Sequence, residues 1–253
     1  MTFINAIRSI LFNIIFYLFS LIYIPSLVLL CLWPNDWLVR RGIAGYCLVC
    51  KVIGLVIMGI RWEYRGLEKL PKDGALILLS KHQSYLDPIL AFKVRNDITA
   101  LAKRELFDLP FLGHVFKKAH IIRVDRKSRK AHEAMPAAGK HVRDSGSALI
   151  VYPEATRVPV GQKRRLKSGA YYLQRDHDLP VYPVATNAGL FWSKGFWHKP
   201  GTAIYEIGDP FPADLSKEDF MDLTEKTVVS RSDILMQEAG YTGPLGDPKK
   251  EDN

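Results

Sequence analysis

Two long hydrophobic runs open the chain. Between Ser9 and Asn35 no side chain is charged at neutral pH, a stretch of 27 residues, whereas roughly 20 suffice to cross the hydrocarbon layer of a bilayer. A second apolar run covers residues 43–60, and Lys51 is its one charged position. A signal peptide would have an apolar core of roughly 7–15 residues ending in small residues, and a long soluble helix is rarely apolar on every side. The pattern predicts an N-terminal hydrophobic helical membrane motif over residues 1–62.

Arg40 and Arg41 stand between the two runs and limit how such a motif can be oriented. If both runs crossed the bilayer, these arginines would lie on the side opposite to the main domain, against the tendency of basic residues to stay inside. Two arrangements remain open. One is a single span with the basic domain inside, and the other is a helical hairpin that dips into one leaflet, with a kink at Pro25.

The rest of the chain alternates between short apolar runs and segments with helical periodicity. Continuous apolar runs are typical of strands covered on both faces, and they predict strands at residues 75–79, 98–102, 121–124, 148–152, 181–185 and 202–207. Helical patterns fall at residues 131–142, 168–178 and 216–239. This alternation predicts an α/β fold, a largely parallel sheet flanked by helices, over residues 63–242. Residues 243–253 are expected to form a loose tail.

Charge is distributed unevenly along the chain, whose formal net charge is +9. Residues 63–205 carry 25 basic and 13 acidic side chains, and residues 206–253 carry 5 and 12. A basic middle region beside an apolar start indicates an anionic partner. The apolar fraction of 48% excludes a disordered or low-complexity protein.

All three cysteines, Cys31, Cys47 and Cys50, lie in the first 50 residues. A disulfide framework is therefore not expected, and a reducing compartment fits best. The spacing of Cys47 and Cys50 resembles a metal or redox pair, but two thiols in an apolar segment without a second pair are far more often inert. No metal site is predicted, because no pattern such as His-Glu-x-x-His is present.

The first predicted strand is followed by the segment Lys81-His82-Gln-Ser-Tyr-Leu-Asp87-Pro88. Asp87 and Pro88 are typical of a helix start, with aspartate as N-cap and proline as the first helical residue. The Asp87 carboxylate can also reach His82 across one turn. A carboxylate on one ring nitrogen fixes the tautomer, so the other nitrogen can take a proton from a substrate hydroxyl. His82 and Asp87 are therefore candidate catalytic residues.

Spacing alone does not identify this pair, because His120 and Asp125 repeat it. On a strand, however, that odd offset sends the two side chains to opposite faces. His82 and Asp87 are distinguished by the polar residues at the ends of other predicted strands. In a parallel sheet these strand ends converge on one crevice, where such folds bind their ligands. These residues are Lys103, Arg126, Glu154 and Arg157.

Four segments in this order resemble the motifs of the glycerolipid acyltransferase family, and most closely those of the bacterial 1-acylglycerol-3-phosphate acyltransferases. They are His82-x₄-Asp87, the strand that leads to Arg126, Pro-Glu-Ala-Thr-Arg at 153–157, and Pro-Val-Tyr-Pro-Val at 180–184. The resemblance covers roughly residues 60–205. It implies that His82 is the general base and that Asp87 orients it. It also implies that Lys103, Arg126 and Arg157 bind the phosphate of the acceptor, and that Glu154 orders its loop and helps to place the glycerol.

Two positions depart from the family pattern. Ala155 stands where the third motif usually has glycine, and Arg123 stands where the second usually has phenylalanine. Since glycine permits a positive φ, alanine implies a slightly different turn or a strain of ~1 kcal/mol. Neither departure removes a reacting group, but both bear on the choice of acceptor.

The resemblance implies transfer of a fatty acyl group from acyl-CoA or acyl-ACP to the sn-2 hydroxyl of 1-acylglycerol-3-phosphate. The product would be phosphatidic acid, made for phospholipid biosynthesis at the cytoplasmic face of a bacterial inner membrane. These donors are co-substrates, and no further cofactor is implied. Direct transfer in a ternary complex is expected, because the sequence contains no Gly-x-Ser-x-Gly elbow for a covalent intermediate.

A basic run follows the third motif and includes Lys163, Arg164 and Arg165. We interpret it as a contact for the donor's phosphates or for the membrane. Nucleic acid is not expected, because aromatic residues do not interleave with the run. Two alternatives stay open: the same chemistry on another lysophospholipid or a lyso-aminolipid, and a non-catalytic membrane protein that binds anionic lipid.

Overall fold

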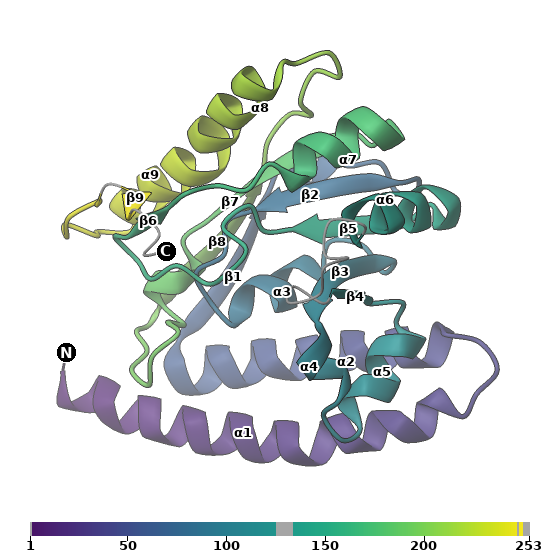
Figure 1. Cartoon of the computed structure of the whole chain (residues 1–253). Coiled ribbons are helices and arrows are strands. Elements are labelled where there is room, and N and C mark those ends of the chain that lie inside the picture. The colour runs from purple at the N-terminus through teal and green to yellow at the C-terminus, as the bar shows by residue number, and fades with distance from the viewer. Residues whose placement is uncertain (1, 125–133, 247, 250–253) are drawn as a thin grey trace.

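The computed structural model describes residues 2–124, 134–246 and 248–249, and its centre is a seven-stranded sheet (Figure 1). The strand order is β1-β8-β7-β2-β5-β3-β4. The strands are β1 (Ile60–Arg65), β2 (Leu76–Ser80), β3 (Ile98–Lys103), β4 (Ile122–Val124), β5 (Ala148–Val151), β7 (Val181–Thr186) and β8 (Gly201–Ile207). All neighbouring strands are parallel except β7 and β8. The predicted α/β fold with a largely parallel sheet is therefore confirmed.

Helices cover both faces of the sheet (Figure 1). Their bounds are α1 (Phe3–Cys31), α2 (Trp37–Ile53), α3 (Leu86–Ala91), α4 (Arg104–Phe107), α5 (Leu112–Lys118), α6 (Ala134–Ser145), α7 (Gly169–His177), α8 (Lys217–Thr224) and α9 (Arg231–Glu238). A π-helical segment, Glu225–Ser230, joins α8 to α9. The two-residue strands β6 (Lys163–Arg164) and β9 (Pro248–Lys249) pair separately from the main sheet.

The side chains of β2 alternate between two cores, as the two-residue period of a strand requires. Leu76 and Leu78 belong to a cluster with α2 and α3, whereas Ile77 and Leu79 belong to a second cluster with α6, α7 and α8. All four side chains are fully buried. This burial on both faces explains why the strand has an unbroken apolar sequence.

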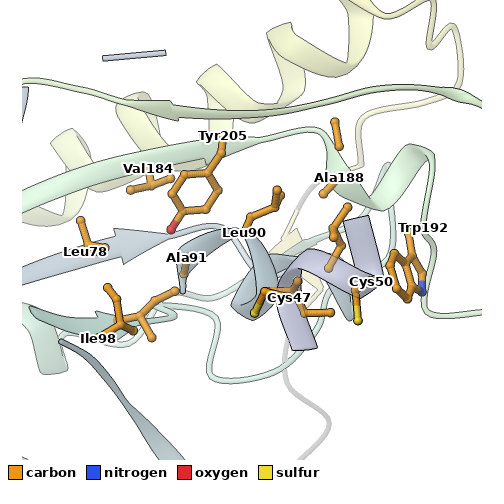
Figure 2. Packing of buried hydrophobic residues seen from close by; sticks show 14 of the residues in the cluster. Cys47, Cys50, Leu78, Leu90, Ala91, Ile98, Val184, Ala188, Trp192 and Tyr205 are labelled. Atoms are coloured by element: carbon orange, nitrogen blue, oxygen red, sulfur yellow. The ribbon is translucent and has the colours of Figure 1, made fainter. Parts of the chain in front are cut away.

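The helix α2 is part of the first of these cores. Figure 2 shows its residues Cys47 and Cys50 among core side chains such as Leu90 and Trp192. Both thiols are free, and burial raises their pKa values to about 12. They are core residues of low reactivity, because the reactive thiolate form is suppressed.

The two N-terminal helices form a hairpin along one side of the molecule (Figure 1). By length and composition, Phe3–Cys31 and Trp37–Met58 could each cross a membrane. However, α1 packs against the rest of the chain at two separate places, through Phe12 in its first half and through Leu27 near its end. A helix of 29 residues is about 43 Å long and here lies along the domain. The two helices pack as a helical hairpin, and the way this hairpin meets a membrane stays a prediction.

The structure adds detail that the sequence does not predict at three places. The division expected between residues 62 and 63 falls inside β1, whose pairing partner β8 lies about 140 residues later. The short helices α4 and α5 were not predicted. The tail expected to be loose contributes β9, which pairs in parallel with β6. The predicted C-terminal helix is present, and its N-cap Ser216 accepts a hydrogen bond from Asp219 N–H at 3.1 Å.

Candidate active site

The site is built on two loops that leave neighbouring strands at the same edge of the sheet. Strands β2 and β5 are paired in parallel up to Leu79 and Val151, so the segments that follow them emerge side by side. Val158 N–H donates to the carbonyl of His82 at 2.8 Å and ties the two loops together. The sequence prediction that these strand ends converge is correct.

His82 and Asp87 are in direct contact. His82 Nδ1 lies 2.9 Å from Asp87 Oδ2, and the same oxygen accepts from the backbone N–H groups of Gln83 and Ser84 at 2.7 and 2.8 Å. The Asp87 side chain is fully buried, whereas that of His82 is 16% exposed. Because an ionised carboxylate only accepts hydrogen bonds, a neutral imidazole in this contact has its proton on Nδ1 and leaves Nε2 without one.

The role of Asp87 in the local fold differs from the predicted one. Helix α3 begins at Leu86 after Tyr85, so Asp87 and Pro88 lie inside its first turn. The carboxylate turns back to the loop that precedes the helix instead of capping the helix itself. Pro88 is tolerated there because first-turn N–H groups have no partner within the helix.

A stacked aromatic ring fixes the plane of the His82 imidazole. The rings of His82 and Tyr152 lie 3.9 Å apart with an interplanar angle of 15°. Tyr152 is the first residue after β5. The orientation of His82 therefore depends on both loops, with Asp87 holding one ring edge and Tyr152 covering one face.

Glu154 forms a buried ion pair with Lys81, the residue before His82. Lys81 Nζ lies 2.6 Å from Glu154 Oε1, and the two side chains are 1% and 0% exposed. The second carboxylate oxygen accepts from His82 N–H at 3.0 Å. Burial raises the pKa of Glu154, and the Lys81 ammonium opposes that rise. Glu154 therefore links the two loops by charge and by hydrogen bonding.

Ala155 occupies the turn that follows, with a φ of 56°. This is the left-handed region that glycine adopts without cost and that other residues enter at about 1–2 kcal/mol. The sequence predicts either a different turn at Ala155 or a strained one. The structure has the strained turn, in which alanine adopts the conformation typical of glycine.

Arg157 follows two residues after Ala155 and is partly buried. Its guanidinium carbon is 3.8 Å from the centre of the Tyr85 ring, a cation–π contact that holds the charge in place. Among the described residues, Arg157 Nη1 is a buried nitrogen without a hydrogen-bond partner. A guanidinium held in this way has donors to offer to an anion.

The other predicted basic residues occupy different positions. Lys103 is exposed at the carboxyl end of β3, two strands from β2. Arg126 lies outside the described residues. Asp125 does too, so the expectation that it does not contact His120 stays a prediction. Lys163 Nζ lies 3.1 Å from Glu225 and 3.8 Å from Asp233. Arg164 and Arg165 are exposed.

The acyltransferase family model matches residues 61–187, which contain all of the loops described above. The chain belongs to the acyltransferase family. It is therefore an enzyme of this type, as the sequence resemblance predicted.

Individual relatives within this family agree with the assignment. The 1-acyl-sn-glycerol-3-phosphate acyltransferase of Pseudomonas aeruginosa is 32% identical over 217 residues, which cover 85% of this chain and 84% of that protein. The human 1-acyl-sn-glycerol-3-phosphate acyltransferase beta is 27% identical over 61% of this chain and 57% of its own length. The crystal structure of the 1-acyl-sn-glycerophosphate acyltransferase of Thermotoga maritima has the same fold, with a TM-score of 0.74 and 23% identity over 94% of this chain and all of that one.

Sequence reasoning assigned no role to two residues that shape this acyltransferase site. Lys81 pairs with Glu154, and Tyr152 stacks on His82. A lysine at the end of a fully buried strand was an available signal, because such a charge requires a buried partner. The stacking of Tyr152 has no signal in the sequence, since it depends on the pairing of β2 with β5.

Proposed function

We propose that the protein transfers a fatty acyl group from acyl-CoA or acyl-ACP to the sn-2 hydroxyl of 1-acylglycerol-3-phosphate, giving phosphatidic acid. The observation that carries the proposal is the 2.9 Å contact between His82 Nδ1 and Asp87 Oδ2, since it prepares Nε2 as a general base. The activity named for the Pseudomonas aeruginosa relative supports this acceptor.

The reaction follows from the tautomer of His82. Nε2 accepts the proton of the acceptor hydroxyl while the hydroxyl oxygen attacks the carbonyl carbon of the thioester. A C–O bond forms, and the tetrahedral oxyanion then collapses with cleavage of the C–S bond. The departing thiolate takes the proton from Nε2 and leaves as a thiol, so the imidazole returns to its neutral state. Asp87 stays ionised and stabilises the imidazolium that exists between these steps.

Arg157 is the proposed anchor for the phosphate of the acceptor, together with Lys103 and Arg126. Its Nη1 is a buried donor that the described residues leave without a partner, and a guanidinium binds two phosphate oxygens at once. For Glu154 we assign the ordering of its loop and not a contact with glycerol. Both of its oxygens already accept hydrogen bonds within the protein, and its side chain is buried.

The proposed location is the cytoplasmic face of a bacterial inner membrane, with the hairpin of α1 and α2 in one leaflet. The outward side of α1 supports this, because it exposes large apolar residues along its length, from Phe3 to Leu29. An apolar helix that lies along a domain gains most by lying in the plane of the lipid interface. Of the basic run, Arg164 and Arg165 are exposed and are the residues we assign to the donor or to lipid phosphates.

An acyl-transfer assay on the purified protein tests this function. The acceptors are 1-acylglycerol-3-phosphate, its analogue without phosphate, other lysophospholipids and a lyso-aminolipid, each offered with acyl-CoA and with acyl-ACP. We expect turnover with 1-acylglycerol-3-phosphate and far less without the phosphate. Turnover that is equal with and without the phosphate would contradict the acceptor, and lipid binding without any turnover would favour the non-catalytic alternative.

A further inference from the structure

Helix α1 contains two buried polar residues that its membrane role does not explain. Ser9 is fully buried and Asn13 is 7% exposed, in a helix whose large apolar residues are mostly exposed. Buried polar side chains are tolerated where they are hydrogen-bonded. Both residues bond to the same distant segment, the connection between β7 and β8.

Four hydrogen bonds hold this segment to α1, one of them from Ser9 Oγ to the carbonyl of His198 at 3.4 Å. Asn13 Nδ2 donates to the carbonyl of Phe196 at 2.8 Å, and His198 N–H donates to Ser9 Oγ at 3.0 Å. His198 Nε2 lies 3.2 Å from Asn13 Oδ1. Burial lowers the pKa of His198 to about 4, so the ring is neutral at pH 7 and its single N–H suffices for this bond. We call Ser9, Asn13 and His198 the polar clasp.

The clasp fixes a turn that presents two aromatic rings to the exterior. Phe196 is 51% exposed and Trp197 is 48% exposed. Their rings pack edge to face at 4.8 Å, and Ser193 Oγ donates to the carbonyl of Trp197 at 2.8 Å. These contacts hold the two rings in place while leaving them exposed.

The surroundings of the rings have the chemistry of a lipid interface. Lys194 and Lys199 are exposed on either side of the pair. Along the outward side of the same half of α1, Ile10 and Ile14 are 44% and 59% exposed. Aromatic rings beside basic residues are the composition found where proteins meet anionic headgroups.

We propose that the loop 193–197 is a second lipid contact, in which Phe196 and Trp197 enter the headgroup boundary of an anionic bilayer beside α1. Lys194 and Lys199 then face the lipid phosphates. The inference rests on the proposed attachment of the hairpin to a membrane, and the polar clasp sets the depth of the loop relative to α1.

The base of this loop is connected to the catalytic loop. The Trp192 ring packs edge to face on Phe12 and Phe16 of α1, at 4.7 and 4.9 Å. The carbonyl of Trp192 accepts a hydrogen bond from Ser84 Oγ, and Ser84 N–H in turn donates to Asp87. The lipid contact therefore sets the distance between the bilayer and the pair of His82 and Asp87. This distance affects the reaction of an acceptor that lies in the bilayer, but not that of an acceptor in solution.

Site-specific labels test the contact directly. In a Cys31→Ser background, an environment-sensitive fluorophore is placed at Trp197→Cys, at Leu18→Cys on the outward side of α1, or at Tyr172→Cys on α7, across the sheet. The full chain is reconstituted in vesicles of phosphatidylcholine and phosphatidylglycerol. We expect lipids brominated on their chains to quench the labels at positions 18 and 197, and aqueous iodide to quench the label at 172.

Each other outcome has a distinct meaning. If brominated lipids quench the label at position 18 but iodide quenches the label at position 197, the proposed loop contact is wrong and the membrane attachment of α1 is retained. If both report water, the attachment fails and the inference fails with it. A label at 197 that neither quencher reaches would indicate contact with a second copy of the chain, which would also overturn the inference.

A kinetic experiment tests the consequence for the reaction. We expect F196S/W197S to raise the KM for a long-chain acceptor in vesicles on the order of tenfold, with an unchanged kcat for a short-chain acceptor in solution. The matched control is Y172S/I234S, which removes two exposed apolar side chains from α7 and α9. Equal KM values for the two variants would overturn the inference, whereas a failure of the proposed function would abolish turnover of both acceptors by the unmodified protein.

Discussion

His82 and His198 each have one ring nitrogen bonded to a side-chain oxygen, yet their surroundings differ in charge and in access. His82 faces the Asp87 carboxylate at 2.9 Å and is 16% exposed. His198 faces the Asn13 amide at 3.2 Å and is 2% exposed, and its burial lowers its pKa to about 4. A carboxylate stabilises a transient imidazolium and an amide does not. The charge of the partner, together with access from outside, therefore separates a candidate base from a structural histidine.

The largest effect is expected when His82 receives the kind of partner that His198 has. Asp87→Asn leaves an amide against the ring, which no longer fixes the tautomer or stabilises the imidazolium. We expect kcat to fall at least about 100-fold with a folded protein, measured by steady-state acyl transfer and by thermal unfolding. Asp219→Asn, at the exposed start of α8, is the control and should keep full activity. A kcat within a few-fold of normal for Asp87→Asn would contradict the role of the carboxylate.

A second prediction concerns the buried ion pair of Lys81 and Glu154, whose carboxylate also accepts a hydrogen bond from His82 N–H. Lys81→Met leaves the Glu154 carboxylate buried without a counter-charge, which should cost about 3–5 kcal/mol of unfolding free energy. Glu154→Gln should cost less, because its amide oxygen can still accept from His82 N–H. Denaturant unfolding of each variant gives these values.

The double variant Lys81→Met/Glu154→Gln serves as the control for this pair. It contains no unpaired charge, so its loss of stability should be smaller than the sum of the two single losses. Strict additivity of the three values would show that the two side chains do not interact.

A third prediction uses the cation that accompanies His82. Arg157→Ala should raise the KM for 1-acylglycerol-3-phosphate about tenfold or more, because a charge-assisted contact to phosphate is lost, with a smaller effect on kcat. Arg175→Ala is the matched control, since Arg175 is an exposed arginine that also lies over tyrosine rings. Equal KM values for the two variants would remove Arg157 from the acceptor site.

The smallest effect is expected from the structural histidine. The pKa of His198 is about 4 in the folded chain and near 6.5 in an unfolded one, so the unfolded state binds more protons between these values. Stability should therefore fall as the pH drops from about 6.5 towards 4, by at most about 1.4 kcal/mol per pH unit from this group. His198→Gln should flatten that part of the profile in denaturant titrations, and an unchanged slope would contradict the assignment.

The two histidines also show which features a sequence can predict. His82 and Asp87 are five positions apart, so local geometry was enough to pair them. His198 meets Asn13 across 185 positions and Lys81 meets Glu154 across 73, and no local pattern connects residues so distant. For the same reason the sequence places residues 60–62 in the apolar membrane motif, since only the pairing of β1 with β8 identifies them as part of a strand. The sequence predicts that the turn at Ala155 has either a different backbone conformation or a strained one, and only the observed φ of Ala155 distinguishes the two.

The most direct test of the account is to compare His82→Ala and His198→Ala in one acyl-transfer assay at saturating donor and acceptor. We expect His82→Ala to lose about 100-fold or more in kcat while its lipid binding stays intact. We expect His198→Ala, when it is folded, to keep kcat within a few-fold of normal. Near-normal turnover by His82→Ala, or an equal loss in both variants, would contradict the claim that the imidazole facing Asp87 is the base.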